Sequence, residues 1–352
     1  FAFFSCLLGS GLSGEKTIRY LVSMIMLCRM RPSIAPFLGR IIRYFYSNCE
    51  TLDNHILFFF YDWMAEQLVN FDLKWNWAEW TSDGLINPAK KLFIEEIIDR
   101  LSRNLYVDRI KNALPESFCS LVTETCEKNF NEDMYNDPSV QELVTKVRSR
   151  QRFEEIFPND TTLSHTTFSS FVRAILIAGS ATISHSIAFL DLHKKSLTHM
   201  INQNPEFVQL LMQELCTFWM HNVQVIEVLT QKLVLYKIVN PTVLLRAFMA
   251  VTKNEELIKF KMWNVVFNIL DIINLRISQC KERIIEIRKD FAEDFINEEI
   301  AAINKAIAIY IPEKEEFLTA LTDIVESIRQ GTDNPHLSKT LKAIQAMISK
   351  SK

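Results

Sequence analysis

Residues 58–80, FFFYDWMAEQLVNFDLKWNWAEW, join a helical repeat of apolar side chains to a cluster of tryptophans. The stretch contains four of the six tryptophans of the chain. Its first half predicts a helix over residues 51–71 with one buried face, because side chains suited to a core recur three or four residues apart. These side chains are Ile56, Phe59, Phe60, Trp63, Met64, Gln67, Leu68 and Phe71.

The second half of the stretch places Trp75, Trp77 and Trp80 in a W-x-W-x-x-W pattern. Positions two apart do not share a helix face, so we expect this segment to turn and insert its rings into a core. Each indole can bury roughly 200 Å², and we expect Trp75→Ala or Trp77→Ala to cost about 3–5 kcal/mol of stability. The alternative is that the rings form a platform on which RNA bases stack. Only one basic residue, Lys74, lies among the rings, and this disfavours the alternative.

The composition favours helices. The 352 residues include only seven glycines and ten prolines, and 48% of the residues are hydrophobic, which is enough for a large core. The length predicts about two domains. A mean hydropathy of +0.05 suits a chain with partner-covered surface or a well-packed helical array. The net charge is only −3, so the chain as a whole has no electrostatic attraction to nucleic acid.

The seven cysteines are scattered, and none forms a C-x-x-C pair. This usage predicts reduced, buried thiols in a nuclear or cytosolic compartment. No apolar run reaches the ~18 residues that a membrane helix needs. Phe1–Leu8 is apolar but has no basic residue before it, so we interpret it as the edge of a fragment and not as a signal peptide.

We expect no catalytic residues, no cofactor and no metal site, and therefore no enzyme. Gly9–Thr17, GSGLSGEKT, resembles a phosphate loop, but Glu15 stands where the lysine must be, so we expect a turn and no tight ATP binding. His185, His193 and His199 are eight and six residues apart, whereas metal ligands on one helix are three or four apart. These histidines are expected at the surface or at helix caps.

Helix starts recur at dipeptides in which Asn or Asp precedes proline. The Asx side chain can cap the first free N–H groups, and proline at the first helical position loses no hydrogen bond. We expect helices over residues 15–30, 33–46 and 88–104, and in the second of these Phe37, Ile41, Ile42 and Phe45 should point inward. The dipeptides are Asn87-Pro88, Asp137-Pro138, Asn204-Pro205, Asn240-Pro241 and Asn334-Pro335. The number of these dipeptides and the spacing from Pro205 to Pro241 predict an array of helix pairs.

A polar, turn-rich segment between Leu114 and Asp137 predicts a domain boundary. Lys146–Arg152, KVRSRQR, follows it with four basic residues. This cluster is either an RNA-phosphate contact or a solvated helix end, and the second interpretation is favoured because four charges supply little affinity at physiological salt.

Residues 242–311 contain neither glycine nor proline. Within them apolar residues alternate steps of four and three, which predicts a heptad seam and a long helix that folds back on residues 294–309 as a hairpin. Pro312 should end the hairpin, and helices over 314–330 and 334–350 should close the array, the last as a cap. The seam residues are Ile273, Ile277, Cys280, Ile284, Ile287 and Phe291.

Two parts of the chain resemble the family of nuclear cap-binding complex large subunits. Residues 61–80, YDWMAEQLVNFDLKWNWAEW, are similar to its second helical domain. Residues 168–222 resemble the start of its third domain, including the helix with Ser184-His185-Ser186, the helix ending in Trp219 and the run over 225–238. The resemblance implies an all-α superhelix of HEAT/ARM-like repeats of the initiation factor 4G middle-domain type. The first such domain of the family would precede Phe1.

On this resemblance, residues 1–118 and 138–352 are the second and third domains, and 119–137 is the linker. Trp63, Trp75, Trp77, Trp80 and Trp219 are structural core. The family's coiled-coil excursion is shorter here.

The resemblance also implies a function. The chain is expected to be a nuclear scaffold, able to shuttle to the cytoplasm, that holds a small cap-reading subunit with an RNA-recognition fold. Capped RNA is then an indirect partner, and export, splicing and decay factors are others. The alternative is an unrelated helical-repeat adaptor in translation initiation or nuclear transport.

Overall fold

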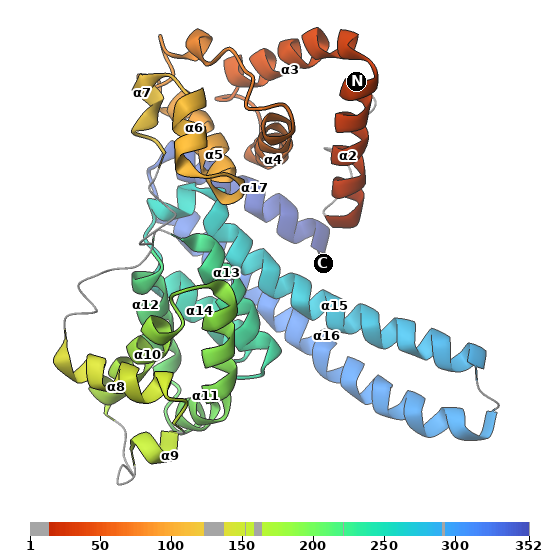
Figure 1. The fold of residues 1–352 in the computed structure, drawn as a ribbon. Helices are drawn as coiled ribbons and strands as arrows, with labels where there is room; N and C mark the ends of the chain where they lie inside the picture. Colours follow the sequence, from red (N-terminus) through yellow and green to blue (C-terminus); the bar gives the residue numbers. More distant parts are fainter. Residues whose placement is uncertain are drawn as a thin grey trace. The chain divides into compact units, whose positions relative to one another are not determined.

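The computed structural model describes residues 14–122, 137–151, 153–157, 164–220, 222–290 and 293–351. Within these residues every regular element is a helix, which confirms the all-α prediction (Figure 1). No helix in these ranges is both long and apolar enough to span a bilayer. The predicted turn over Gly9–Thr17 falls mostly outside them, apart from the start of the first described helix.

The chain divides into two compact units. Unit 1 comprises residues 1–128 and 334–351, and unit 2 comprises residues 129–333. We expected the helix over 334–350 to close the second domain, but in the structure it packs on α4 of unit 1. Its apolar stripe requires a covering face, and the order of the sequence does not specify which face that is. The stripe consists of Leu337, Leu341, Ile344 and Ile348.

Unit 1 is built around one central helix, α4. The elements of this unit are α2 (Gly14–Met30), the short turn η1 (Pro32–Ile34), α3 (Ala35–Ser47), α4 (Asn54–Asn70), η2 (Trp77–Trp80), α5 (Pro88–Asn104), α6 (Val107–Ala113), α7 (Glu116–Cys119) and α17 (Pro335–Ser351). α2, α5 and α17 all contact α4. The helices predicted over 15–30, 51–71 and 88–104 are thereby confirmed within a few residues.

The surroundings of α4 and α3 differ from the prediction in two respects. α4 buries Leu57, Phe58 and Tyr61 as well as most of the predicted stripe, so it is apolar nearly all round, as expected of a central helix. Ile56 and Phe71 of the stripe are only partly buried. In α3, Ile42 and Phe45 are buried as predicted, whereas Phe37 is 58% exposed. Among the described residues the guanidinium of Arg40 lies over this ring, 4.6 Å from its centre, and the ring does not join the core.

Unit 2 is an array of helices in two layers. The helices of this unit are α8 (Pro138–Arg148), α9 (Phe153–Ile156), α10 (His165–Ala178), α11 (Ile183–Gln203), α12 (Phe207–Phe218), α13 (Val223–Leu235), α14 (Pro241–Val251), η4 (Glu256–Ile258), α15 (Phe260–Asp290) and α16 (Glu293–Gln330). Even-numbered helices from α8 to α16 contact one another in series, and α11, α13 and α15 form the second series. This alternation is that of stacked helix pairs.

A close approach joins the first pair of the array. A Cβ atom added to Gly179, at the end of α10, would lie 2.7 Å from the Cα of Ser186 in α11. The hydroxyl of Ser186 donates to the carbonyl oxygen of Gly179 at 2.7 Å. The small residues at these two positions therefore set the distance between the helices.

The predicted hairpin is present, but its second arm is longer than expected. α15 and α16 pack along each other as antiparallel arms (Figure 1). Pro312 lies inside α16, which continues to Gln330, so the prediction that this proline ends the hairpin was wrong. Proline removes one backbone hydrogen bond, but α16 packs on both α14 and α15, and this packing holds the helix through the interruption.

Four of the five Asx-Pro dipeptides start helices as predicted. The side-chain oxygen of Asn87, for example, accepts from the N–H groups of Ala89 at 2.9 Å and Lys90 at 3.1 Å. The exception is Asn204-Pro205, where the helix begins at Phe207. Asn204 still accepts from the N–H of Glu206.

Candidate interaction surfaces

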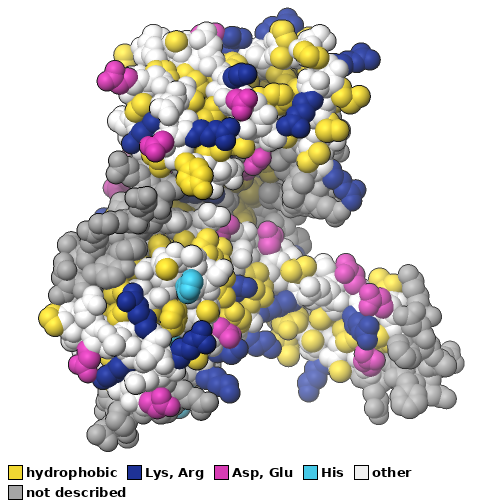
Figure 2. Space-filling model, in the orientation of Figure 1, with side chains coloured by type: hydrophobic (Ala, Val, Ile, Leu, Met, Phe, Trp, Pro, Cys, Tyr) yellow, Lys and Arg dark blue, Asp and Glu magenta, His cyan; other side chains and the backbone are white. Residues whose placement is uncertain are grey.

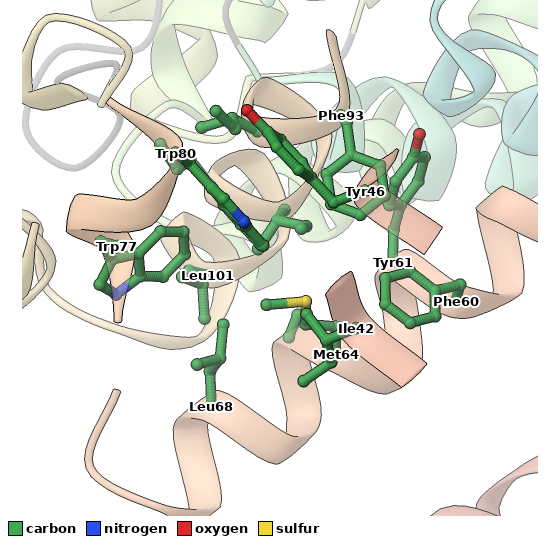
Figure 3. Packing of buried hydrophobic residues seen from close by; sticks show 14 of the residues in the cluster. Ile42, Tyr46, Phe60, Tyr61, Met64, Leu68, Trp77, Trp80, Phe93 and Leu101 are labelled. Atoms are coloured by element: carbon green, nitrogen blue, oxygen red, sulfur yellow. The ribbon is translucent and has the colours of Figure 1, made fainter. Parts of the chain in front are cut away.

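The tryptophans of the opening stretch form the core of unit 1. Trp80 is 1% exposed, stacks on Tyr46 with ring centroids 4.4 Å apart, and meets Trp77 edge to face (Figure 3). Trp63 and Trp77 are buried as well, and Trp75 is half-buried beneath the guanidinium of Arg43. In unit 2, Trp219 is also buried. The buried rings are enclosed by their neighbours and cannot stack on a base.

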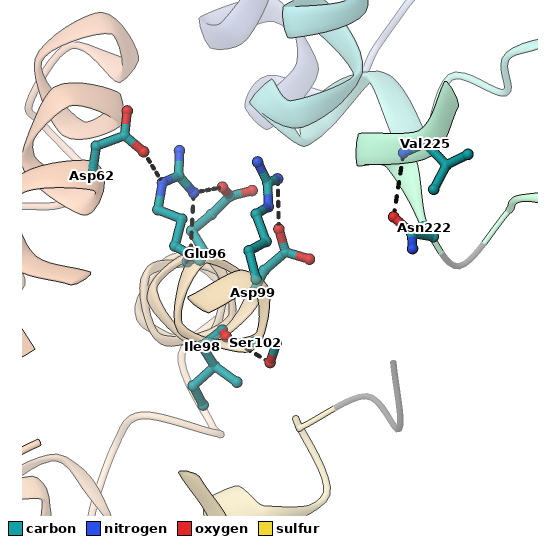
Figure 4. A network of polar contacts seen from close by, with 9 residues as sticks. Asp62, Glu96, Ile98, Asp99, Ser102, Asn222 and Val225 are labelled. Carbon is teal, nitrogen blue, oxygen red and sulfur yellow. Dashed lines mark hydrogen bonds and ion pairs between the residues drawn. The ribbon is translucent and has the colours of Figure 1, made fainter. Parts of the chain in front are cut away.

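A charged network missed by the sequence reasoning lies beside this core. Arg100 of α5 is 5% exposed and donates to the carboxylate of Asp62 in α4 and, at 2.6 Å, to that of Glu96 (Figure 4). Burial lowers the pKa of Arg100, but the two carboxylates outweigh it, and the net pKa is raised. Its guanidinium also lies over the rings of Phe58 and Tyr61. The i, i+4 spacing of Glu96 and Arg100 was the available signal.

A mixed polar and apolar cleft of about 370 Å³ lies where α17 meets α4 and α5. Lys339 of α17 reaches across it, and its ammonium donates to the carbonyl oxygens of Cys49 at 3.1 Å and Glu50 at 2.8 Å. The Nδ2 atom of Asn54 donates to the hydroxyl of Thr340 at 2.9 Å. These bonds tie α17 to the turn between α3 and α4 and to the first residue of α4, so these polar groups of the cleft already serve packing.

A groove of about 420 Å³ runs between the arms of the hairpin. We call it the hairpin groove. Its residues are Ile277 and Lys281 of α15 and Ile311, Lys314, Glu315, Leu318 and Thr319 of α16. Ile285 continues the α15 stripe one turn outward, and it is 53% exposed, while Ile311 is 40% exposed. Its lining mixes apolar side chains with two lysines, one glutamate and one threonine, which suits a protein partner that presents an apolar side chain beside polar groups.

Near the base of the hairpin, one oxygen of Glu313 is buried without a hydrogen-bond partner among the described residues. Burial raises the pKa of this carboxyl, with Arg276 and Lys237 opposing the shift. A raised pKa means that the carboxyl favours folding below its unfolded pKa, and that this contribution is lost as the pH rises through the folded pKa.

We therefore expect Glu313→Gln to stabilise the protein at pH 7 by a few tenths to about 1 kcal/mol. The gain should disappear near pH 4, because the wild-type carboxyl is then largely protonated. Thermal unfolding at both pH values measures this. Glu282→Gln, at an exposed position on α15, is the control, and a Glu313→Gln variant less stable than the wild type at pH 7 would contradict the expectation.

The basic segment over 146–152 is divided between a helix end and a turn. Lys146 pairs with Glu142 at 2.8 Å within α8, which ends at Arg148. Arg150 adopts a left-handed conformation with φ of 58°. The arrangement is that of a helix end in which one charge is already paired, and Arg152 lies outside the described residues.

The three histidines do not converge. The ring of exposed His185 lies 2.7 Å from the hydroxyl of Thr182, the residue that caps α11, and exposed His199 contacts Gln203. His193 is 1% exposed and packs edge-on against Phe171, so the expectation of a surface or capping position was wrong for it. Its neighbours at i−3 and i+4 on α11, Leu190 and Leu197, are also buried, which is a core pattern.

Comparison with known proteins identifies both halves of the chain. Two family models, each described as MIF4G like, match residues 2–116 and residues 130–351. The nuclear cap-binding protein subunit 1 of Schizosaccharomyces pombe is 30% identical over 228 residues, which cover 60% of this chain and 29% of that protein.

Two animal proteins match more of the chain at lower identity. Nuclear cap-binding protein subunit 1-A of Xenopus laevis is 21% identical over 78% of this chain and 38% of its own length. Nuclear cap-binding protein subunit 1 of Aedes aegypti is 22% identical over 77% of this chain and 35% of its own length. The chain thus spans roughly a third of the length of these relatives.

Proposed function

Because the chain belongs to the MIF4G-like family of helical domains, we propose that it is the scaffold part of a nuclear cap-binding complex large subunit. The observation that carries this proposal is the pair of family matches in tandem, together with relatives that are named as subunit 1 of nuclear cap-binding proteins. The proposed role is non-catalytic. The chain would act in the nucleus, in the processing, export and decay of RNA polymerase II transcripts.

In this proposal the small subunit reads the cap. Reading a methylated cap requires two exposed aromatic faces that sandwich the base, with acidic groups that offset its positive charge. The tryptophans of this chain are instead mostly enclosed in the cores of the two units. A rigid helical array is well suited to grip another folded domain over a large area.

We expect the chain alone to bind a cap analogue weakly and without distinguishing methylated from unmethylated forms. Together with the small RNA-recognition subunit, it should bind the methylated analogue selectively. Fluorescence titration with both analogues, for the chain alone and for the complex, makes the comparison. Submicromolar, methyl-selective binding by the chain alone would contradict the proposal, as would failure to form the complex, unless adding the relatives' preceding domain restored it.

The hairpin groove is the surface that we propose for a protein partner of this complex. Ile311 is an exposed apolar side chain that lines the groove, and Ile285 is exposed one turn beyond its lining residue Lys281. The two lysines of the lining outnumber its one glutamate, so the groove favours an acidic partner over a basic one. We expect Ile285→Asp or Ile311→Asp to reduce co-purification of the small subunit at least tenfold, a loss of about 1.4 kcal/mol.

Leu192→Asp on α11 is the matched control, since Leu192 is 42% exposed and lies outside the groove. Binding that falls equally in all three variants would indicate general damage. Binding that is unchanged in the two hairpin variants would place the small subunit elsewhere.

The alternative is a helical-repeat adaptor of translation initiation or nuclear transport. The MIF4G-like description alone is compatible with it. Mass spectrometry of proteins that copurify with the chain separates the two, because only the first function requires a small cap-reading subunit.

A further inference from the structure

Residues 17–49, which form η1, α3 and α2 apart from its first three residues, have an unusual charge pattern. Residues 17–49 contain five arginines but no lysine, aspartate or glutamate, whereas the whole chain has a net charge of −3. A local excess of this size is hidden when charge is counted over the full length. The arginines are Arg19, Arg29, Arg31, Arg40 and Arg43.

Three of these arginines, Arg29, Arg31 and Arg40, are exposed, and among the described residues none of the three forms an ion pair. Arg43 differs, because its guanidinium forms a bidentate ion pair with the carboxylate of Glu79, and both nitrogen–oxygen distances are 2.7 Å. Arg29 and Arg31 flank the corner between α2 and η1, and Arg40 lies farther along α3. Within the described residues, therefore, no carboxylate offsets the charge of these three cations.

Exposed rings lie on the same part of the surface. Phe37 is 58% exposed and Tyr44 is 59% exposed. Seven residues apart, they share one face of α3 about two turns, or roughly 10 Å, apart. Arg40 lies between them in sequence, and its guanidinium carbon is 4.6 Å from the centre of the Phe37 ring. Over α2 and α3, cationic and hydrophobic side chains lie side by side (Figure 2).

We propose that this arginine–aromatic surface, made of Arg29, Arg31, Phe37, Arg40 and Tyr44, binds single-stranded RNA. Guanidinium groups match the geometry of phosphate oxygens and also stack on flat rings. Exposed aromatic rings stack on bases irrespective of sequence. The binding is independent of the proposed cap function, because it requires neither a cap nor the small subunit.

The arrangement favours RNA over the other anionic partners. A strand of RNA alternates phosphates with flat bases, and α3 alternates a ring, a guanidinium and a ring along one face. An acidic polypeptide would pair with the arginines but would gain little from the exposed rings of Phe37 and Tyr44. A bilayer surface would also attract these arginines, and the vesicle titration below distinguishes it from RNA.

The test is fluorescence anisotropy of the chain with a short, uncapped, labelled oligouridine over a series of salt concentrations. We expect Phe37→Ala and Tyr44→Ala each to weaken binding by roughly fivefold or more, the loss of one stacked base. Arg40→Ala should weaken binding and lower the slope of log K against log salt by about 0.7, the value for one phosphate contact on a single strand. Arg40→Lys should retain the slope and lose part of the affinity.

Tyr106→Ala and Arg246→Ala are the controls, because Tyr106 is 81% exposed on unit 1 and Arg246 is exposed on α14 of unit 2. Neither should change binding. All the variants alter exposed positions, and unchanged thermal unfolding confirms that each folds. Vesicles with phosphatidylserine and poly-glutamate are titrated in parallel.

Three results would overturn the proposal. The first is the absence of RNA binding even at about 50 mM salt, where phosphate contacts contribute most to affinity. The second is RNA binding that survives both ring substitutions and Arg40→Ala. The third is equal or tighter binding of vesicles or poly-glutamate with the same dependence on the arginines, which would assign the surface to lipid or acidic protein. None of these results bears on whether the chain joins a cap-binding complex.

Discussion

Trp80→Ala is expected to lower the free energy of unfolding of unit 1 by about 3–5 kcal/mol, as truncation of a buried aromatic does. The ring is 1% exposed and contacts Tyr46, Trp75, Trp77 and Phe93. Removing it opens a cavity at the point where η2 meets α3 and α5. Chemical denaturation monitored by circular dichroism measures the change.

Trp77→Ala should have an effect of similar size, because Trp77 is 3% exposed. The structure revises the expectation for Trp75→Ala to about 1–2 kcal/mol, since a half-buried ring leaves less surface to be lost. Trp80→Phe is the conservative control. The Trp80 ring nitrogen is buried without a hydrogen bond among the described residues, so its loss breaks none. Wild-type stability in both the Trp77 and Trp80 alanine variants would refute the assignment of these rings to the core.

The second large effect is expected at Arg100. Arg100→Met should cost about 3–5 kcal/mol, because it leaves the carboxylate of Glu96 buried without its partner. Glu96 is 5% exposed, so water cannot replace the guanidinium. Urea unfolding measures the loss.

The double variant Arg100→Met with Glu96→Gln separates two quantities. One is the cost of leaving the Glu96 carboxylate buried and unpaired, and the other is the net contribution of the ion pair to stability. The double variant should recover most of the stability, because no unpaired charge then remains in the core. Arg103→Met, one turn along α5, is the matched control. Arg103 pairs with Asp99 at 2.9 Å, but both side chains are at least 25% exposed, so less than about 1 kcal/mol is expected. An Arg100 variant that resembles the Arg103 variant would show that the network adds little.

Local signals predicted the elements of this fold well. The apolar repeat of α4, the caps at Asn87 and Asn240, and the hairpin of α15 and α16 all rest on residues close together in sequence. Such signals do not specify which distant face an element covers. This explains why the position of α17, the exposure of Phe37 and the burial of His193 differed from expectation.

The candidate surfaces were harder to predict for a similar reason. The sequence reasoning considered the tryptophan segment as a base platform and found only Lys74 among the rings. The structure places the cation of Arg43 over Trp75, from a helix 32 residues earlier in the chain. The arginines of α2 and α3 were also visible in the sequence, but a charge count over the whole chain concealed them. A count by segment would have found them.

The position of α17 has a consequence for how the protein is made. Unit 1 is completed by residues that follow unit 2, so about 200 residues must be synthesised between its two parts. At about 5–20 residues per second, this takes roughly ten to forty seconds on the ribosome. During that time the side of α4 that receives α17, including Leu57 and Tyr61, has no cover from α17. The nascent protein therefore has a defined interval in which a chaperone can bind this face, and folding of unit 1 is completed only after unit 2 has been synthesised.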